Sequence, residues 1–330
     1  MTQSGLAQRL HVSQGKISKI EQGMQGVSDE LLNGIASELG YPPSFFEQSG
    51  SIYPPATPFH RKKQSLTRKE ESQVEAIANI QRQHFLCLQK AADFDYDVPS
   101  LDIDEYGSPE KVAMVLRSYW RLPKGPIENL TEVLEDAGIV VVHISNVSDK
   151  MDGFTLISPQ AKPIVFLNAK MPGDRMRFTL AHELGHIVMH GIHTPDMENE
   201  ANKFASEFLM PAKEIKPQLR PVSLPKLASL KPYWKVAMAA LLKRASDLGV
   251  LTPNQTRYMW IKMAPYRMRE PVEIDVEIET PTLFRELITF HLKDLEYSVD
   301  DLCAALHMDK TDFVSNYCDS GRYGHLVAVK

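Results

Sequence analysis

The pentapeptide His182-Glu-Leu-Gly-His186 constrains this chain more than any other feature. It lies in a stretch, residues 174–190, that contains no proline and whose apolar residues recur at helical spacing. Two histidines four residues apart lie on one face of a helix, so both imidazoles can bind one tetrahedral zinc ion. Glu183, beside the first histidine, can take a proton from metal-bound water, and Gly185 leaves room for the close approach of a strand or a substrate. We therefore expect a helix over residues 174–190 that carries a zinc site.

A catalytic zinc ion needs a third protein ligand and an open position. His190 continues the row of histidines, but one straight helix cannot wrap three successive turns around a small ion. The next predicted helix, residues 197–209, offers Glu198 and Glu200, which point about 200° apart around its axis. Asn202 follows Glu198 by one turn and can orient a metal ligand through a hydrogen bond without binding the metal itself. We expect Glu198 to be the third ligand and keep Glu200 as the alternative.

The motif His-Glu-Leu-Gly-His, followed by the pattern E-x-E-A-N-x-F-A-x-x-F-L-M-P, resembles the ImmA/IrrE family of metallopeptidases over about residues 109–215. The resemblance implies a small zincin-like α/β peptidase domain of gluzincin type with one Zn²⁺ per chain. It implies His182, His186 and Glu198 as ligands and Glu183 as the general acid and base. Such proteins often cleave or regulate a repressor or an antitoxin-like partner, so it also implies a regulatory protein as the substrate.

The first fifty residues predict a string of short helices, with Ser13 as the N-cap of a helix over residues 14–22. Their pattern, Gln3-x-x-Leu-Ala-x-x-Leu-x-Val-Ser-x-x-x-Ile-Ser-x-Ile-Glu-x-Gly, resembles the Xre family of helix-turn-helix regulators over about residues 2–47. The resemblance implies operator DNA as a partner, with residues 14–22 in the major groove, and a homodimer on a two-fold site. The family has one more helix, which would precede Met1.

The expected DNA contacts lie at the start of this motif and on its second helix: Gln3, Ser13, Gln14, Lys16 and Lys19. Gln14 can pair with adenine, and the two lysines can reach guanine or phosphate. Residues 1–50 carry three basic and five acidic side chains, a net charge of −2, which weakens non-specific attraction to phosphate. A helical module for protein contact or dimerisation is therefore the alternative for this segment.

The remaining pattern is mostly helical, with three short strand candidates at residues 139–144, 153–157 and 163–167. We therefore expect an α+β fold, mostly α. The predicted domains are a helix-turn-helix domain over residues 1–50, a proline-rich linker over 51–66, a metallopeptidase domain over 67–215 and a helical C-terminal extension over 216–330.

Within the extension, residues 233–249 predict one amphipathic helix, and residues 298–317 resemble a degenerate helix-turn-helix. Residues 211–270 carry twelve basic and three acidic side chains, whereas residues 271–330 carry five basic and twelve acidic ones. The acidity of the tail argues against DNA and for packing or partner binding.

The chain of 330 residues has no apolar run of the length that spans a membrane, a polar N-terminus and only three cysteines, so we expect a cytoplasmic protein. We expect a DNA-binding transcriptional regulator whose zinc-dependent endopeptidase domain cleaves a specific regulatory partner encoded nearby. The alternative is an antitoxin or regulator of a toxin–antitoxin or phage-related operon that binds a cognate toxin, with a non-catalytic zinc site.

Overall fold

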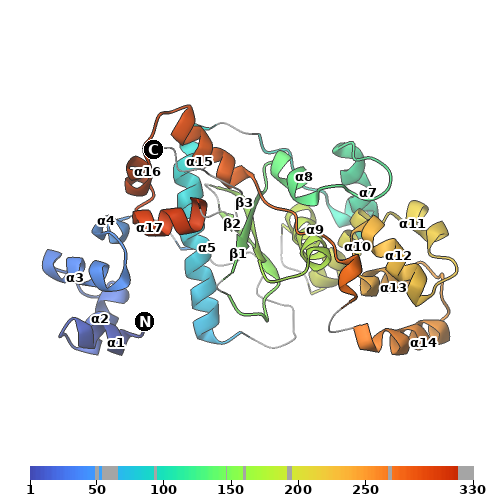
Figure 1. Cartoon of the computed structure of the whole chain (residues 1–330), viewed down its shortest axis with the longest axis horizontal. Coiled ribbons are helices and arrows are strands. Elements are labelled where there is room, and N and C mark those ends of the chain that lie inside the picture. Colours follow the sequence, from blue (N-terminus) through green and yellow to red (C-terminus); the bar gives the residue numbers. More distant parts are fainter. Residues whose placement is uncertain are drawn as a thin grey trace. The chain divides into compact units, whose positions relative to one another are not determined.

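The computed structural model describes residues 1–48, 52–53, 66–92, 95–145, 147–158, 161–191, 195–266 and 270–318 (Figure 1). It is mostly helical with one small sheet, which confirms the predicted fold class. The chain forms two compact units: the first comprises residues 1–52, 83–92 and 285–330, and the second comprises residues 53–82 and 93–284. The predicted domain boundaries stay predictions, and most of the predicted linker, residues 51–66, lies outside the described residues.

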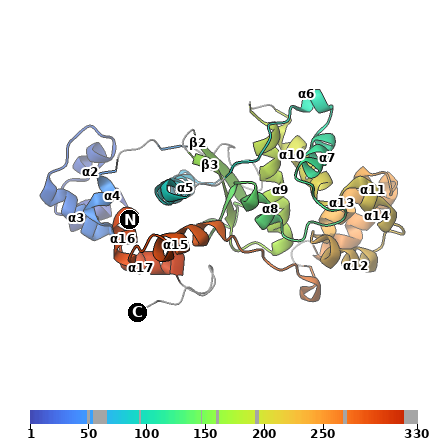
Figure 2. The same cartoon turned by 90° about the horizontal axis from the view of Figure 1, so that it is seen from above.

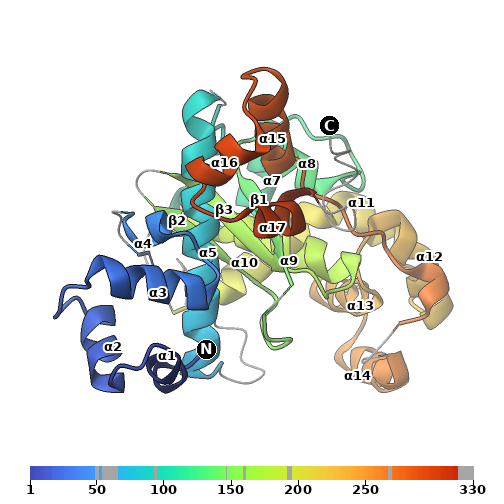
Figure 3. The ribbon, with the colours of Figure 1, turned by 60° about the vertical axis from the view of Figure 1, so that its left-hand side comes forward.

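The first unit begins with short helices: α1 (Gln3–Arg9), α2 (Gln14–Glu21), α3 (Asp29–Leu39) and α4 (Pro43–Phe46). Figure 3 shows α1, α2 and α3 as a small bundle, closed by buried Leu6, Ala7, Ile17 and Ile35. The Ser13 hydroxyl accepts a hydrogen bond from the Lys16 backbone N–H and so caps α2, as predicted.

The helix α5 (Arg68–Leu88) belongs to the second unit in its first part and to the first unit in its last part, and a 3₁₀ turn, Gln89–Ala91, follows it. The other helices of the first unit come from the end of the chain. They are α15 (Leu283–Lys293), α16 (Val299–Ala305) and α17 (Lys310–Phe313), the last continued by a π-helical turn, Val314–Cys318. His84 Nδ1 on α5 lies 2.7 Å from the Tyr317 hydroxyl, and the Cys87 thiol donates to the carbonyl of Ala305.

The helices α16 and α17 repeat the geometry of α1 and α2 at a constant offset of 296 residues. Both pairs are joined by a left-handed histidine, with φ of 52° at His11 and 51° at His307. The same backbone hydrogen bond closes each turn, 3.0 Å from Val12 to Ala7 and 3.0 Å from Met308 to Cys303. The other equivalent positions are the N-caps Thr2 and Ser298, the N-caps Ser13 and Asp309, Leu6 and Leu302, Leu10 and Leu306, and Ile17 and Phe313. The predicted degenerate helix-turn-helix is therefore present as a backbone motif.

The second unit is built on a three-stranded sheet of β1 (Val140–Ile144), β2 (Gly153–Ser158) and β3 (Ala161–Asn168), in the order β1-β3-β2. The strand β1 runs parallel to β3, with Val140 opposite Ile164, and β2 runs antiparallel to β3, with Gly153 opposite Leu167. The central strand is buried on both faces from Pro163 to Asn168, as its run of apolar residues suggests.

Further helices of this unit pack on the sheet or against one another beside it. They are α6 (Ile103–Tyr106), α7 (Pro109–Tyr119), α8 (Leu130–Asp136), α9 (Gly173–Met189) and α10 (Met197–Leu209). The helix α9 packs on β2 and β3, and α10 packs between α9 and α7 (Figure 1). Because α9 lies in the core, thirteen of its seventeen residues are buried.

Four further helices complete the second unit: α11 (Ala212–Gln218), α12 (Leu224–Trp234), α13 (Met238–Asp247) and α14 (Pro253–Met263) (Figure 2). The predicted single helix over residues 233–249 is wrong. The chain leaves the helical conformation at Lys235, where φ is 54°, and α13 starts afresh with the Glu270 carboxylate accepting from the Met238 and Ala239 N–H groups. Within the described part of the chain, no helix has the length and apolarity that crossing a membrane requires.

Candidate metal centre

The two motif histidines and one glutamate converge from neighbouring helices. His182 Nε2 and His186 Nε2 on α9 lie 3.1 Å apart, and each lies near a carboxylate oxygen of Glu198 on α10, at 3.4 Å and 3.2 Å. His182 and His186 are buried, whereas Glu198 is partly exposed, so the group is open on the Glu198 side. The structure thus brings together the three residues predicted as ligands.

These separations fit a metal ion. In tetrahedral coordination with bonds of about 2.05 Å, donor atoms lie about 3.3 Å apart, close to the three distances here. Contacts with His182 first and His186 second hold the pKa of the Glu198 carboxyl well below its usual range, so Glu198 is ionised at neutral pH. Two imidazole nitrogens and a carboxylate form the mixed N/O donor set that zinc accepts.

Glu183 is buried on the sheet side of α9, where Thr155 holds it. The Thr155 hydroxyl on β2 donates to Glu183 Oε2 at 2.6 Å. Gly153 lies on the same face of β2, and a Cβ there would meet the Thr179 side chain, one helical turn before Glu183, at 2.9 Å. The missing side chain at Gly153 therefore lets β2 approach α9 closely enough for Thr155 to reach Glu183. Sequence analysis missed Thr155, since a threonine in a strand carries no signal of this role.

Gly185 allows the close approach of a helix. A Cβ at this position would meet the Phe204 ring at 3.0 Å and the backbone of Ala201 at 3.3 Å, both on α10. The expectation that a strand or a substrate would approach Gly185 is therefore wrong: its neighbour is the helix that carries Glu198.

The remaining predicted site residues lie around the three donors. Glu200 accepts from His190, with 3.0 Å between Oε2 and Nε2, so it does not point toward the centre. Burial first, and the neighbouring His186 second, lower the pKa of His190 below its ordinary value. The Asn202 amide donates to the backbone carbonyl of Glu198 rather than to its carboxylate.

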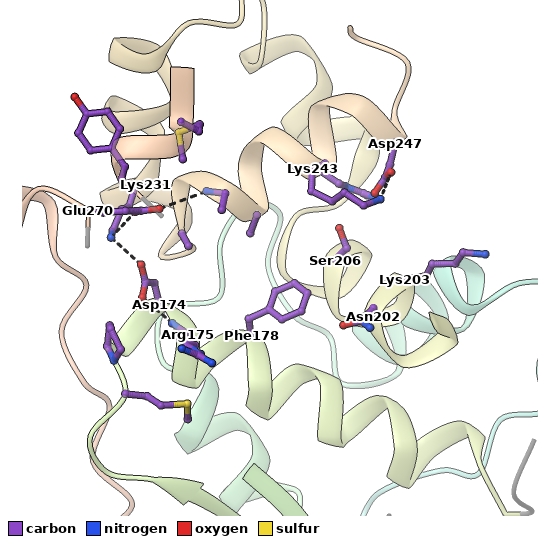
Figure 4. Close-up of a pocket in the computed structure, with 18 of the residues that line it drawn as sticks. Asp174, Arg175, Phe178, Asn202, Lys203, Ser206, Lys231, Lys243, Asp247 and Glu270 are labelled. Carbon is purple, nitrogen blue, oxygen red and sulfur yellow. Dashed lines mark hydrogen bonds and ion pairs between the residues drawn. The ribbon is translucent and has the colours of Figure 1, made fainter. Parts of the chain in front are cut away.

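A pocket of about 1150 Å³ lies beside the metal centre, between α9, α10 and α13 (Figure 4). Phe178 and Asn202 line it, each one turn from a donor residue on its helix, so the pocket begins about 6 Å along the helices from the centre. At the far end the Lys231 ammonium bonds Asp174 at 2.7 Å and Glu270 at 2.8 Å, as Figure 4 shows. One ammonium thus bridges two carboxylates, so this end of the pocket keeps a net negative charge.

The predicted DNA contacts lie together in the first unit. Gln14 Nε2 donates to Gln3 Oε1 at 2.8 Å, and Gln3 Nε2 donates to Glu21 Oε2 at 2.6 Å, so the two glutamines hold each other in place. Lys19 is exposed and Lys16 is half-buried, whereas the Ser13 hydroxyl caps α2. Of the five residues, Gln3, Ser13 and Gln14 thus already have hydrogen-bond partners in the structure.

Comparison with known families agrees with both motifs. The model of the IrrE N-terminal-like domain matches residues 134–246, which include β1, α9 and α10. The helix-turn-helix model matches residues 1–46. A comparison with curated proteins finds no match. The predicted combination of the two domains in one chain is confirmed.

Proposed function

We propose that this chain, which joins a helix-turn-helix DNA-binding domain to an IrrE-like domain of a peptidase family, is a transcriptional regulator with a zinc-dependent endopeptidase activity toward a regulatory protein. The observation that carries the proposal is the arrangement of His182, His186 and Glu198 at tetrahedral separations, with Glu183 held beside them by Thr155. A purely structural zinc site has four protein ligands, whereas three protein donors and a neighbouring buried carboxylate suit hydrolysis.

The residues of the site divide the work of peptide hydrolysis. A zinc ion held by His182, His186 and Glu198 would supply Lewis-acid polarisation of water and of the substrate carbonyl. Glu183 takes a proton from the attacking water on its carboxylate and passes it to the nitrogen of the departing amine. Thr155 donates a hydrogen bond to one carboxylate oxygen of Glu183, so the other oxygen can accept and release the proton.

The pocket beside the centre supports a polypeptide substrate. Its lining includes the apolar Phe178, Ala240 and Met263 and the exposed cations Arg175, Lys203 and Lys243. An extended peptide advances about 3.3 Å per residue, so the pocket begins about two residues from the bond that would be cut. We expect a large apolar side chain at that point, with acidic residues around it.

Co-expression with the product of the adjacent gene tests the proposal. Intact-mass analysis should show a truncated partner with the wild type and an intact partner with Glu183→Gln, although both versions should bind one zinc ion. An intact partner that binds both versions stably would contradict proteolysis and favour the antitoxin alternative.

A further inference from the structure

His190 and Glu200, the two other candidate ligands, lie on the side of His186 that faces away from His182 and Glu198. His190 Nδ1 is 2.9 Å from His186 Nδ1, the ring nitrogen that does not face His182 and Glu198. Glu200 Oε2 is 3.0 Å from His190 Nε2. A carboxylate, an imidazole and a second imidazole therefore form a row that ends at the metal centre.

The chemistry of these groups fixes the position of each proton in the row. A carboxylate only accepts hydrogen bonds, so His190 Nε2 must donate to Glu200. A neutral imidazole carries one N–H, so His190 Nδ1 is then an acceptor, and the proton between the rings belongs to His186 Nδ1. The lone pair of His186 Nε2 then faces the Glu198 carboxylate at 3.2 Å, an arrangement that a cation between the two groups stabilises.

We propose that His190 and Glu200 are positioning residues that hold His186 in the tautomer able to bind a metal ion. This inference rests on the metal centre of the proposed function but requires no proteolysis. Metal-binding histidines usually donate their second N–H to a carboxylate or a carbonyl, and here an intervening imidazole extends that link to a carboxylate on the next helix.

Burial and chain geometry keep the row in place. The His190 side chain is 3% exposed, and its backbone N–H donates to the carbonyl of His186 at the end of α9. Glu200 lies in the first turn of α10, two residues after Glu198, so a single helix supplies both a ligand and the end of the row. His182 differs, because its Nδ1 is buried without a hydrogen-bond partner among the described residues.

Nitrogen NMR on the metal-free, full-length chain tests the tautomer directly. With ¹⁵N-labelled histidine at pH 8, two-bond ¹H–¹⁵N correlations should identify His186 as the Nδ1–H form in the wild type. Glu200→Gln should reduce that preference, since an amide both donates and accepts, and His190→Phe should abolish it. A wild-type His186 protonated on Nε2 would overturn the proposal.

Zinc affinity, measured by competition with a chromophoric chelator, tests the link from Glu200 through His190. His190→Phe should weaken binding about 10–100-fold. Glu200→Gln should weaken it alone but add nothing in the His190→Phe background, because Glu200 acts only through His190. Additive losses would mean that Glu200 contacts the metal itself and would overturn the proposal. The exposed Glu132→Gln, also at a helix start, is the matched control and should bind zinc as the wild type does.

The two experiments separate this inference from the proposed function. If the chain binds zinc as expected but cleaves no partner, the proposed function fails and the positioning roles stand. If the tautomer is wrong while cleavage occurs, the positioning roles fail and the proposed function stands.

Discussion

At the scale of single residues, the Thr155 hydroxyl is the contact that most clearly separates Glu183, the proposed general base, from a merely buried carboxylate. It bonds one oxygen of Glu183 at 2.6 Å, from a strand that no motif singles out. The two candidate metal ligands on α9 could be found from the sequence because helical spacing alone places His182 and His186 on one face. Thr155 was not predictable, because its role depends on the packing of β2 against α9.

Thr155→Val should lower the turnover number of partner cleavage about tenfold. A hydrogen bond to a charged group contributes about 1.5–3 kcal/mol, and its loss frees the Glu183 carboxylate to rotate. Steady-state cleavage and zinc stoichiometry should be measured together, with Thr155→Ser as the control that keeps the hydroxyl. Equal turnover in the valine and serine variants would exclude the orienting role.

At the scale of elements, the contact between α9 and α10 decides where Glu198, the candidate third ligand, lies. Gly185 brings the two helices together, and sequence spacing alone could not say whether a strand, a substrate or a helix would use that room. The sheet, α9 and α10 follow from local periodicity. The break at Lys235 does not, because the Glu270 carboxylate that starts α13 comes from a distant segment.

Gly185→Val should destabilise the protein by about 1–3 kcal/mol and weaken zinc binding, because the added side chain pushes the helix that carries Glu198 away from the histidines. Urea unfolding and chelator competition measure the two effects. Gly15→Val is the control, since a Cβ at Gly15 meets no atom within 4 Å. A Gly185→Val chain with wild-type stability and zinc affinity would show that α10 is not held by this contact.

The contact between α5 and the π-helical turn predicts a pH dependence. Burial lowers the pKa of His84 to about 4, from about 6.5 in an unfolded chain. The unfolded chain therefore binds the proton first, so this stabilisation is complete above pH 6.5 and is lost as the pH falls to 4. The loss amounts to about 3 kcal/mol, and His84→Gln should remove it.

Denaturant unfolding of the wild type and His84→Gln between pH 7 and pH 4 measures that difference. His143, whose pKa burial also lowers to about 4, remains in both proteins and cancels in the comparison. Identical pH slopes for the two proteins would contradict the assignment to His84.

At the scale of the whole molecule, the chain carries a helix-turn-helix domain and a candidate metal centre in separate segments, so each proposed activity should respond to its own substitutions. Lys16→Ala and Lys19→Ala should each weaken binding to the DNA upstream of the gene that encodes this chain. If each lysine contacts phosphate, each substitution should reduce the slope of log affinity against log salt by about 1. Fluorescence anisotropy at several salt concentrations measures both quantities.

Two controls accompany this measurement. Glu183→Gln should bind the same DNA as the wild type does. Ser315→Ala should also leave binding unchanged, because Ser315 is the counterpart of Lys19 in the second helix-turn-helix motif. Unchanged affinity and salt slope in both lysine variants would show that α2 does not read this DNA.

A comparison of the two copies distinguishes the residues that form the backbone motif from the residues proposed to contact DNA. Both copies share helix caps, apolar positions and a left-handed histidine at the turn. They differ on the second helix, where Asp312 and Ser315 stand in the places of Lys16 and Lys19. The same backbone motif thus occurs twice in this chain, and only the first copy has lysines at these two positions.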